Sequence, residues 1–378
     1  MTKQLAGSAR NVRFAGIQQL LVAALCAVAF AGLSPRGSRA QQLSYYDFNT
    51  PQATPSQSST ACNSIAGGPA ANGVRFCLNN SGGGLSYSQD FYPPLIDPNA
   101  STDGGMGSAN YTLQLTGPTG SQASSVWYSI PQNVKGGFTA WYAFKISNAS
   151  SPTGDGFAFV IQNAAGNGTD LLTHCAESGS GLTALGGAGG CLGYGGIDNS
   201  IAIEADTFPD SFDPWDRGYY YYDDNHFALQ ACGAGLANSP AHYASNSVSP
   251  LVPTSCLVNL NGQYAIASNP NSSAGAGGVY IADGNPHQVV IVYNGPNDSP
   301  ANYIYVYLDP AFNQGTHTPV AGSVPLFSGP FDITQYVNLN NGTASIGFTA
   351  ATGGSYEQHE LMGFTFTPHG FGSANVCP

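Results

Sequence analysis

Positive charge is what this sequence lacks most. Its 378 residues include 9 Lys and Arg against 21 Asp and Glu, and only 8% are charged, while Gly (49) and Pro (25) are plentiful. A coiled coil or a mainly helical protein needs many Lys, Glu, Arg and Leu, and a charged disordered chain needs more charge. The composition excludes these classes and favours strands joined by glycine- and proline-rich turns.

Long apolar runs are also missing outside the first forty residues. Residues 1–40 have the pattern of a secretory signal peptide, with basic residues, an apolar run from Phe14 to Leu33 and a small-x-small site ending at Ala40. A membrane anchor is the alternative, but Gln18 and Gln19 interrupt a run that is barely long enough to span. We expect cleavage near Ala40, export to the periplasm or the cell exterior, and one domain over residues 41–378.

Loss of the leader makes the charge imbalance larger. Five of the nine basic residues lie in it, so the mature chain keeps four against 21 acids, a net charge of 4 − 21 = −17. Such a surface repels phosphate backbones, which argues against nucleic acid and membrane insertion as partners. Hard cations and neutral polar ligands such as sugars remain.

Seven cysteines remain after cleavage, and no C-x-x-C spacing supports the alternative of a zinc site. In an exported protein they indicate disulfides. The simplest pairing joins sequence neighbours and leaves Cys377 over: Cys62 with Cys77, Cys175 with Cys191, and Cys232 with Cys256.

Short runs of β-branched and aromatic residues recur between Gly, Pro, Asn and Asp, and several alternate with period two. No stretch of twelve residues after the leader keeps a helical apolar stripe. The fold class predicted is all-β, a sandwich of two antiparallel sheets, with residues 163–196 as a long ordered loop. The predicted strands are Ser44–Phe48, Asn110–Leu115, Gly137–Ile146, Gly156–Gln162, Ser200–Asp206, His226–Ala231, His287–Tyr293, Asn302–Leu308, Thr343–Ala350 and Glu360–Thr367.

One predicted strand carries two carboxylates on the same face. In Ser200–Asp206, alternation places Glu204 and Asp206 together, opposite the side of Ile201 and Ile203. Further acids and one histidine follow within twenty residues. Oxygen donors in this number suit Ca²⁺, and an imidazole among them suits a transition metal such as Mn²⁺. The alternative is a solvated acidic turn.

Four segments, taken in order, resemble the legume-type (L-type) lectins and their bacterial relatives. They cover residues 154 to 361: Gly154–Gln162 (GDGFAFVIQ), Leu185–Tyr194 (LGGAGGCLGY), Ile203–Phe208 (IEADTF) with Asp213-Pro214 and Asn225–Ala228, and Gly347–Gly353 (GFTAATG) with His359–Leu361. The resemblance implies a concanavalin-like jelly-roll sandwich with a Ca²⁺ site and a neighbouring transition-metal site beneath a shallow sugar pocket.

The resemblance also implies roles for individual residues. Asp206 would bridge both ions, Glu204 and His226 would hold the transition metal, and calcium would take Asp210, Asp213 and the backbone carbonyl of Phe208. The Gly154-Asp155 peptide bond would be cis. Sugar would be bound by Asp155 as acceptor, by the Gly190 N–H as donor, by Asp210, and by a loop containing Gly353, Gly354 and Ser355. Trp215 or the run Tyr219–Tyr222 would stack on the sugar or instead cover the long loop.

The chain departs from this family at two positions. Asp210 stands where the family has Asn, and an ionised Asp can accept a hydrogen bond but not donate one to sugar. Residues 217–225 form an insertion before His226, so His226 could instead be an ordinary histidine at the start of a strand. The calcium ligand at 210 survives the exchange.

Three classes of function follow from these observations. We favour a secreted, calcium-dependent carbohydrate-binding protein without catalytic activity, with glycans as partners and a possible homo-oligomer to raise avidity. A structural or adhesive protein with the same metals but little sugar affinity is the alternative. A β-sandwich glycosidase is disfavoured, because an E-x-D-x-x-E strand would need a Glu where Pro209 stands, and no G-x-S-x-G motif indicates a serine hydrolase.

Overall fold

The computed structural model describes the residues that build two sheets and the long connection between them. These are residues 43–45, 76–83, 86–90, 110–128, 130–166, 168–170, 172, 175–208, 226–240, 256–258, 260, 280–313 and 318–369. The leader, Cys62, Asp210, Asp213, Trp215, Tyr219–Tyr222 and Cys377 lie outside them. No helix in the described part is long and apolar enough to cross a membrane.

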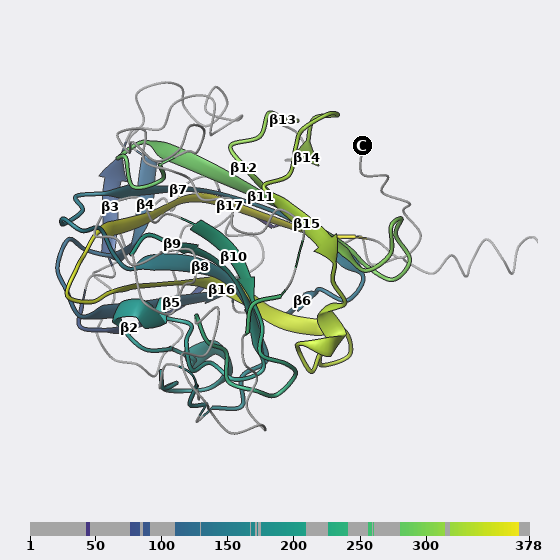
Figure 1. Cartoon of the computed structure of the whole chain (residues 1–378), viewed down its shortest axis with the longest axis horizontal. Helices are drawn as coiled ribbons and strands as arrows, with labels where there is room; N and C mark the ends of the chain where they lie inside the picture. Colours follow the sequence, from purple (N-terminus) through teal and green to yellow (C-terminus); the bar gives the residue numbers. More distant parts are fainter. Residues whose placement is uncertain are drawn as a thin grey trace, which may run out of the picture. The chain divides into compact units, whose positions relative to one another are not determined.

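Two antiparallel sheets form the domain (Figure 1). The eight-stranded sheet has the order β15 (Phe327–Pro330), β12 (Tyr303–Leu308), β11 (Pro286–Asn294), β7 (Gly137–Ser147), β17 (Gln358–Pro368), β4 (Asn110–Thr116) and β3 (Ser86–Asp90), and β1 (Leu43–Tyr45) also pairs with β17. The seven-stranded sheet has the order β10 (His226–Gln230), β9 (Ser200–Asp206), β8 (Gly156–Gln162), β16 (Thr343–Thr352), β5 (Gln122–Tyr128) and β2 (Phe76–Ser81), and β6 (Gln132–Asn133) also pairs with β16.

The remaining elements are short. They are the pair β13 (Phe312–Asn313) and β14 (Thr318–Pro319) and the 3₁₀ helices η1 (Gly181–Thr183), η2 (Gly189–Cys191) and η3 (Ile333–Gln335). The predicted all-β class with two antiparallel sheets is therefore confirmed.

The apolar core lies between the sheets, where one face of every long strand is buried. Aromatic rings from both sheets meet there: Tyr142 of β7 contacts Phe348 of β16 edge to face at 5.2 Å, and Phe348 contacts Phe364 of β17 at 5.1 Å. These edge-to-face arrangements are the favourable ones for aromatic pairs. Period-two alternation in the sequence thus translates directly into this core.

All ten predicted strands occur, and β8 and β9 have the predicted bounds. For the predicted strand Ser44–Phe48 the described part is β1 at Leu43–Tyr45, and residues 46–48 lie outside the described residues. Seven further strands, β2, β3, β5, β6, β13, β14 and β15, are not predicted by the sequence patterns. In β5 the reason is clear, because Gln122, Ser124 and Ser125 break the apolar pattern although all seven residues of the strand are buried.

The segment after β8 covers the outer face of the seven-stranded sheet. Its Leu192, Tyr194 and Ile197 are buried with Trp127 of β5 and Ala202 of β9. Backbone groups of the segment satisfy the polar residues of the sheet, since Trp127 Nε1 and Ser125 Oγ both donate to the Ala184 carbonyl, at 2.8 and 2.7 Å. The predicted long ordered loop is confirmed, and it explains why β5 tolerates serine.

Candidate functional site

Strand β9 presents its carboxylates on the outer face of the seven-stranded sheet, as alternation predicts. Ile201 and Ile203 pack into the core between the sheets, whereas Ala202 packs beneath the covering segment. Glu204 is fully buried, and its Oε2 accepts a hydrogen bond from the hydroxyl of Tyr194 in that segment. Asp206 is 3% exposed. Both acids are thus withdrawn from bulk water, where an anion requires a compensating partner.

Strand β10 brings His226 to these carboxylates. Residue 226 pairs with residue 206 across the two strands, and His226 Nε2 lies 3.7 Å from Glu204 Oε1. His226 is the first residue of β10 and is 3% exposed, so its role as a metal ligand and the alternative of an ordinary histidine at the start of a strand both stay predictions. Gln230 lies four residues further along β10, on the same face of the strand, and its Nε2 donates to Glu204 Oε1 at 2.8 Å.

Four of the six predicted metal ligands lie within the described residues: Glu204, Asp206, Phe208 and His226. Glu204, Asp206 and His226 are buried on the paired strands β9 and β10, and two carboxylates with an imidazole are donor types that suit a transition metal. The described residues contain no group of three or more His, Cys, Asp or Glu arranged to hold an ion. Asp206 Oδ1 accepts from the Phe208 N–H at 2.8 Å, which places residue 208 beside the carboxylate.

The peptide bond between Gly154 and Asp155 is cis, as the resemblance implies. Asp155 is 4% exposed, its N–H donates to the Ala351 carbonyl at 3.2 Å, and its carbonyl accepts from the Thr207 N–H at 3.0 Å. The Asp155 backbone is therefore bonded on one side to β16 and on the other to the residue that follows β9.

Three segments converge on the Asp155 carboxylate. A Cβ added to Gly353 would lie 2.9 Å from Asp155 Oδ2 and 3.0 Å from the Cα of Gly189, so the Asp155 carboxylate and the Gly189 backbone leave no room for a side chain at 353. Gly190, in η2, is exposed. A Cβ on Gly354 would meet nothing within 4 Å, so this position opens outward.

The neighbouring loop closes the same end of the sheet. A Cβ on Gly154 would lie 3.0 Å from the Cβ of Ser355 and 2.9 Å from the ring of Phe208. The Gly353 N–H donates to the Ser355 carbonyl at 2.9 Å. Five residues predicted to contact sugar are thus assembled at one end of the seven-stranded sheet, next to Phe208: Asp155, Gly190, Gly353, Gly354 and Ser355. The sixth, Asp210, lies outside the described residues.

Disulfides restrain several connections of the seven-stranded sheet. Cys175 is bonded to Cys191, the last residue of η2, and Cys232 to Cys256, as sequence-neighbour pairing predicts. Cys77 is also disulfide-bonded, and its predicted partner Cys62 lies outside the described residues. Because Cys191 follows Gly190 directly, the first of these bonds restrains the backbone predicted to face sugar.

A second carboxyl cluster lies within the covering segment. Glu177 Oε2 accepts from the N–H of Gly168 at 3.2 Å, while Asp198 Oδ1 accepts from the N–H of Ala165 at 2.8 Å. Burial, reinforced by the negative charge of Asp198, raises the pKa of Glu177 to about 7. This side chain therefore titrates in the physiological range, although the sequence gives no signal for it.

Several residues around the site could not be identified from their sequence context. Tyr194 and Gln230 hold Glu204, and Thr207 donates from its hydroxyl to Glu357 Oε1. Alternation along β10 gives a weak signal for Gln230, because it shares a face with His226. Thr207 and Glu357 are 150 residues apart. No local pattern links them.

No family model matches the chain. Among solved structures it is similar to lectin II from Ulex europaeus, at 17% identity and a TM-score of 0.45, over 87% of this chain and 99% of that one. A lectin from Bauhinia forficata in complex with GalNAc is 17% identical with a TM-score of 0.40, and the match covers 78% of this chain and 99% of that one. Winged bean acidic lectin complexed with methyl-α-D-galactose is 16% identical with a TM-score of 0.40, and the match covers 86% of this chain and 97% of that one. At these identities the likeness concerns the fold alone.

Proposed function

We propose that the mature chain is a secreted, calcium-dependent carbohydrate-binding protein of the L-type lectin kind, which binds glycans without catalysing a reaction. The observation that supports this most is the convergence of the Asp155 carboxylate, the exposed Gly190 backbone and the open loop at Gly353 and Gly354. An acceptor, a donor and an open backbone edge suit a sugar that presents adjacent hydroxyl groups.

The binding groups divide into acceptors and donors. Asp155 accepts from two neighbouring sugar hydroxyls, and the Gly190 N–H donates to one of them. The backbone from Gly353 to Ser355 forms the opposite wall. Because each contact exchanges a sugar–water hydrogen bond for a sugar–protein one, the affinity of a single site is low. Useful binding then depends on repeated ligands or on association of several copies of the chain.

Metal ions would organise this end of the sheet. In this proposal Asp206, Asp210, Asp213 and the Phe208 carbonyl hold Ca²⁺, and Glu204, Asp206 and His226 hold Mn²⁺ or another transition metal. Bound Ca²⁺ supplies positive charge among carboxylates that otherwise repel one another. The protein's own contribution is to bury Glu204 and Asp206 on one strand face and to place His226 beside them.

A glycan array probed with the mature protein tests the proposal. Binding is measured with calcium, with EDTA, and after calcium is restored, and near-ultraviolet circular dichroism confirms that the protein stays folded in each condition. Asp155→Asn is the matched variant, because it replaces one acceptor oxygen by a donor at nearly constant volume. We expect EDTA-reversible binding that this variant weakens about 10- to 100-fold.

Two other outcomes would point to other functions. Calcium binding without any glycan signal would favour the structural or adhesive alternative, in which the Asp at 210 has removed sugar affinity. Release of reducing sugar from the arrayed glycans would favour a glycosidase and contradict the proposal.

A further inference from the structure

A chain of buried polar side chains lies directly beneath the candidate site. His359 Nε2 is 2.8 Å from Glu357 Oε1, and His359 Nδ1 is 2.6 Å from the Thr116 hydroxyl. The same carboxylate oxygen accepts from the hydroxyl of Thr207. None of these four residues is more than 1% exposed. Polar groups this deep are costly unless they are satisfied, so their arrangement requires an explanation.

The hydrogen bonds join Glu357, His359 and Thr116 into one buried network. Thr116 Oγ1 also donates to the Glu357 carbonyl, at 3.1 Å, so its one proton is committed there. Nδ1 of His359 then donates to Thr116, and Nε2 faces the Glu357 carboxyl oxygen at 2.8 Å. The ring is thus held between Thr116 and Glu357, which fixes its orientation.

Glu357 connects the segments that carry the candidate sugar contacts. Thr207, its hydroxyl partner, donates its N–H to the Asp155 carbonyl at 3.0 Å, and its own carbonyl accepts from the Thr153 hydroxyl at 2.7 Å. On the other side, Glu357 follows Tyr356, whose carbonyl accepts from the Ser150 N–H at 2.7 Å. One carboxylate thus joins the strand end after β9, the segment before β8 and the loop before β17.

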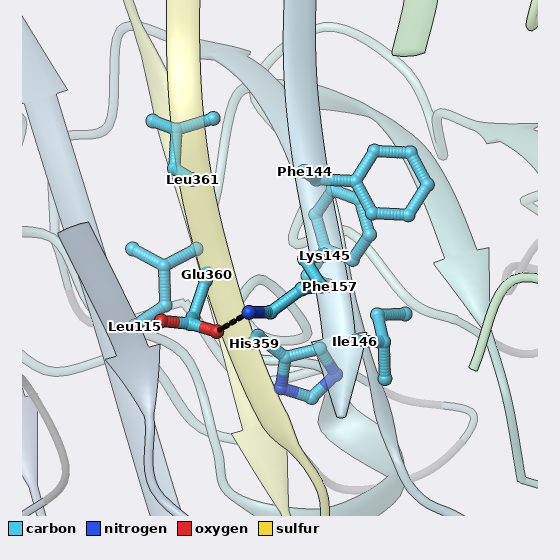
Figure 2. A pocket seen from close by; sticks show the side chains of 8 residues that line it. All are labelled: Leu115, Phe144, Lys145, Ile146, Phe157, His359, Glu360 and Leu361. Atoms are coloured by element: carbon cyan, nitrogen blue, oxygen red, sulfur yellow. Dashed lines mark ion pairs between the residues drawn. The ribbon is translucent and has the colours of Figure 1, made fainter. Parts of the chain in front are cut away.

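The surroundings of the pair make this arrangement specific. His359 lines a small apolar pocket with Leu115, Ile146 and Phe157, and its ring contacts Phe157 at 6.0 Å (Figure 2). Glu357 Oε2 has no hydrogen-bond partner among the described residues. A buried carboxyl group with one unpartnered oxygen does not give the most stable packing for such a position. Replacement of a buried ion pair by apolar residues is often neutral or stabilising.

We propose that Glu357, oriented by His359, is a positioning residue that holds Asp155, Thr207 and the loop at residues 353–356 in the arrangement that binds sugar. The ligand named here rests on the proposed function, but the positioning itself does not. Loss of the carboxylate would release Thr207, and with it the hydrogen bond that fixes the Asp155 carbonyl.

Strand β17, which begins directly after Glu357, provides a matched control. Glu360 is also buried, at 3% exposure, but it pairs with Lys145 Nζ at 3.3 Å and accepts from Thr112 at 2.8 Å. Figure 2 shows this ion pair as a dashed line, with His359 taking no part in it. Glu360→Gln therefore removes a buried charge from β17 without touching the connection to Thr207.

Hydrogen exchange measured by mass spectrometry on the full mature protein in calcium tests the positioning. The informative amides are those of Asp155, Thr207, Gly353 and Tyr356, each of which donates a hydrogen bond at this end of the sheet. In Glu357→Ala we expect these amides to exchange about tenfold faster, with the core strands unchanged. Glu357→Gln keeps an acceptor for Thr207 and should restore protection to within about threefold.

Thr207→Val keeps the test decisive if Glu357→Ala does not fold. It removes only the hydroxyl link, and we expect faster exchange at the same amides. Glu360→Gln should leave them unchanged. Uniformly faster exchange through both sheets in Glu357→Ala, or unchanged exchange in Thr207→Val, would overturn the proposal.

A parallel measurement separates this proposal from the proposed function. On the glycan array, Glu357→Ala should weaken the calcium-dependent signals about tenfold, and Glu357→Gln should recover most of them. If the wild-type protein binds no glycan, the proposed function fails, and the exchange data still decide whether Glu357 positions the loops. Glycan signals in Glu357→Ala equal to those of the wild type would contradict the positioning role.

Discussion

The outer faces of the two sheets are covered in different ways. Trp127 on the seven-stranded sheet and Trp141 on the eight-stranded sheet are both fully buried. Trp127 lies beneath the segment of residues 163–198 and donates to its Ala184 carbonyl. Trp141 instead packs with side chains of its own sheet, such as Val290 and Met362, and contacts the ring of Phe312 in β13 at 6.2 Å.

This difference explains where the candidate site is located. A covering segment rich in glycine brings backbone N–H groups and turns to the end of a sheet, where they can meet a carboxylate such as Asp155. A face closed by aliphatic and aromatic side chains stabilises the fold but offers few groups for a polar ligand. On the proposed function, the eight-stranded sheet acts as the scaffold, and the seven-stranded sheet carries the candidate site.

Removal of the two tryptophans should separate these roles most strongly. Trp127→Ala and Trp141→Ala should each lower the free energy of unfolding by about 3–5 kcal/mol in urea denaturation, because each leaves a large cavity. Among molecules that remain folded, only Trp127→Ala should also weaken glycan binding, since it removes one of the two hydrogen bonds to the Ala184 carbonyl in the segment that carries Gly190. Equal loss of binding in both variants would contradict the division of roles.

Two of the disulfides, Cys175–Cys191 and Cys232–Cys256, give a second comparison. They span 16 and 24 residues, so replacement of either pair by alanine should cost about 3 kcal/mol of stability. Differential scanning calorimetry would measure this. Only the Cys175 and Cys191 double variant should weaken glycan binding and raise the hydrogen-exchange rate at Leu192, whose N–H donates to the Gly189 carbonyl at 2.9 Å. Unchanged exchange at Leu192 would show that the bond does not hold the backbone around Gly190.

The eight-stranded sheet has its own pH-dependent element. Burial disfavours the charged form of His287, but its hydrogen bonds and attraction to Asp309 and Asp283, at 2.7 and 3.2 Å, outweigh this and raise the pKa of the imidazole. The resulting stabilisation is complete below the ordinary histidine pKa and is lost as the pH rises through the raised one.

His287→Gln should therefore lose stability, by about 1 kcal/mol, mainly on the acidic side of this transition. Urea unfolding from pH 5 to 9 checks it. Because His287 lies on the scaffold sheet, glycan binding by the folded protein should not change. A variant whose stability deficit grows with rising pH would have the wrong sign for this account.

The covering segment should show the smallest effect, also with pH. Because the pKa of Glu177 is raised to about 7 in the folded chain, its protonated form is favoured there, and the stabilisation is lost as the pH rises from the ordinary glutamate value through about 7. Glu177→Gln should remove this dependence. Hydrogen exchange of residues 175–198 at pH 6 and 8, corrected for intrinsic rates, measures it. A pH dependence that persists in the variant would implicate another group.

The sequence predicted those features of the fold that depend on local pattern. Alternation identified β8 and β9 with their bounds and placed Glu204 and Asp206 on one face. It missed β5, because Ser124 and Ser125 are tolerated there only beneath the covering segment.

The candidate site shows the same limit. The family resemblance anticipated the cis bond at Gly154-Asp155 and the residues around it. The hydrogen bonds that link Thr207 and His359 to Glu357 were not anticipated. Thr207 and Glu357 are far apart in the sequence, and only the folded chain brings them together. Asp210 and Asp213 lie outside the described residues, and their roles stay predictions.

The calcium dependence of glycan binding tests the central claim most directly. Binding of the mature protein to a multivalent glycan surface is followed as free Ca²⁺ is raised, for the wild type, Asp206→Asn and Glu360→Gln. We predict a saturable curve whose midpoint moves at least about tenfold to higher calcium in Asp206→Asn and stays in place in Glu360→Gln. Binding that ignores calcium, or one shared midpoint for all three proteins, would contradict the account.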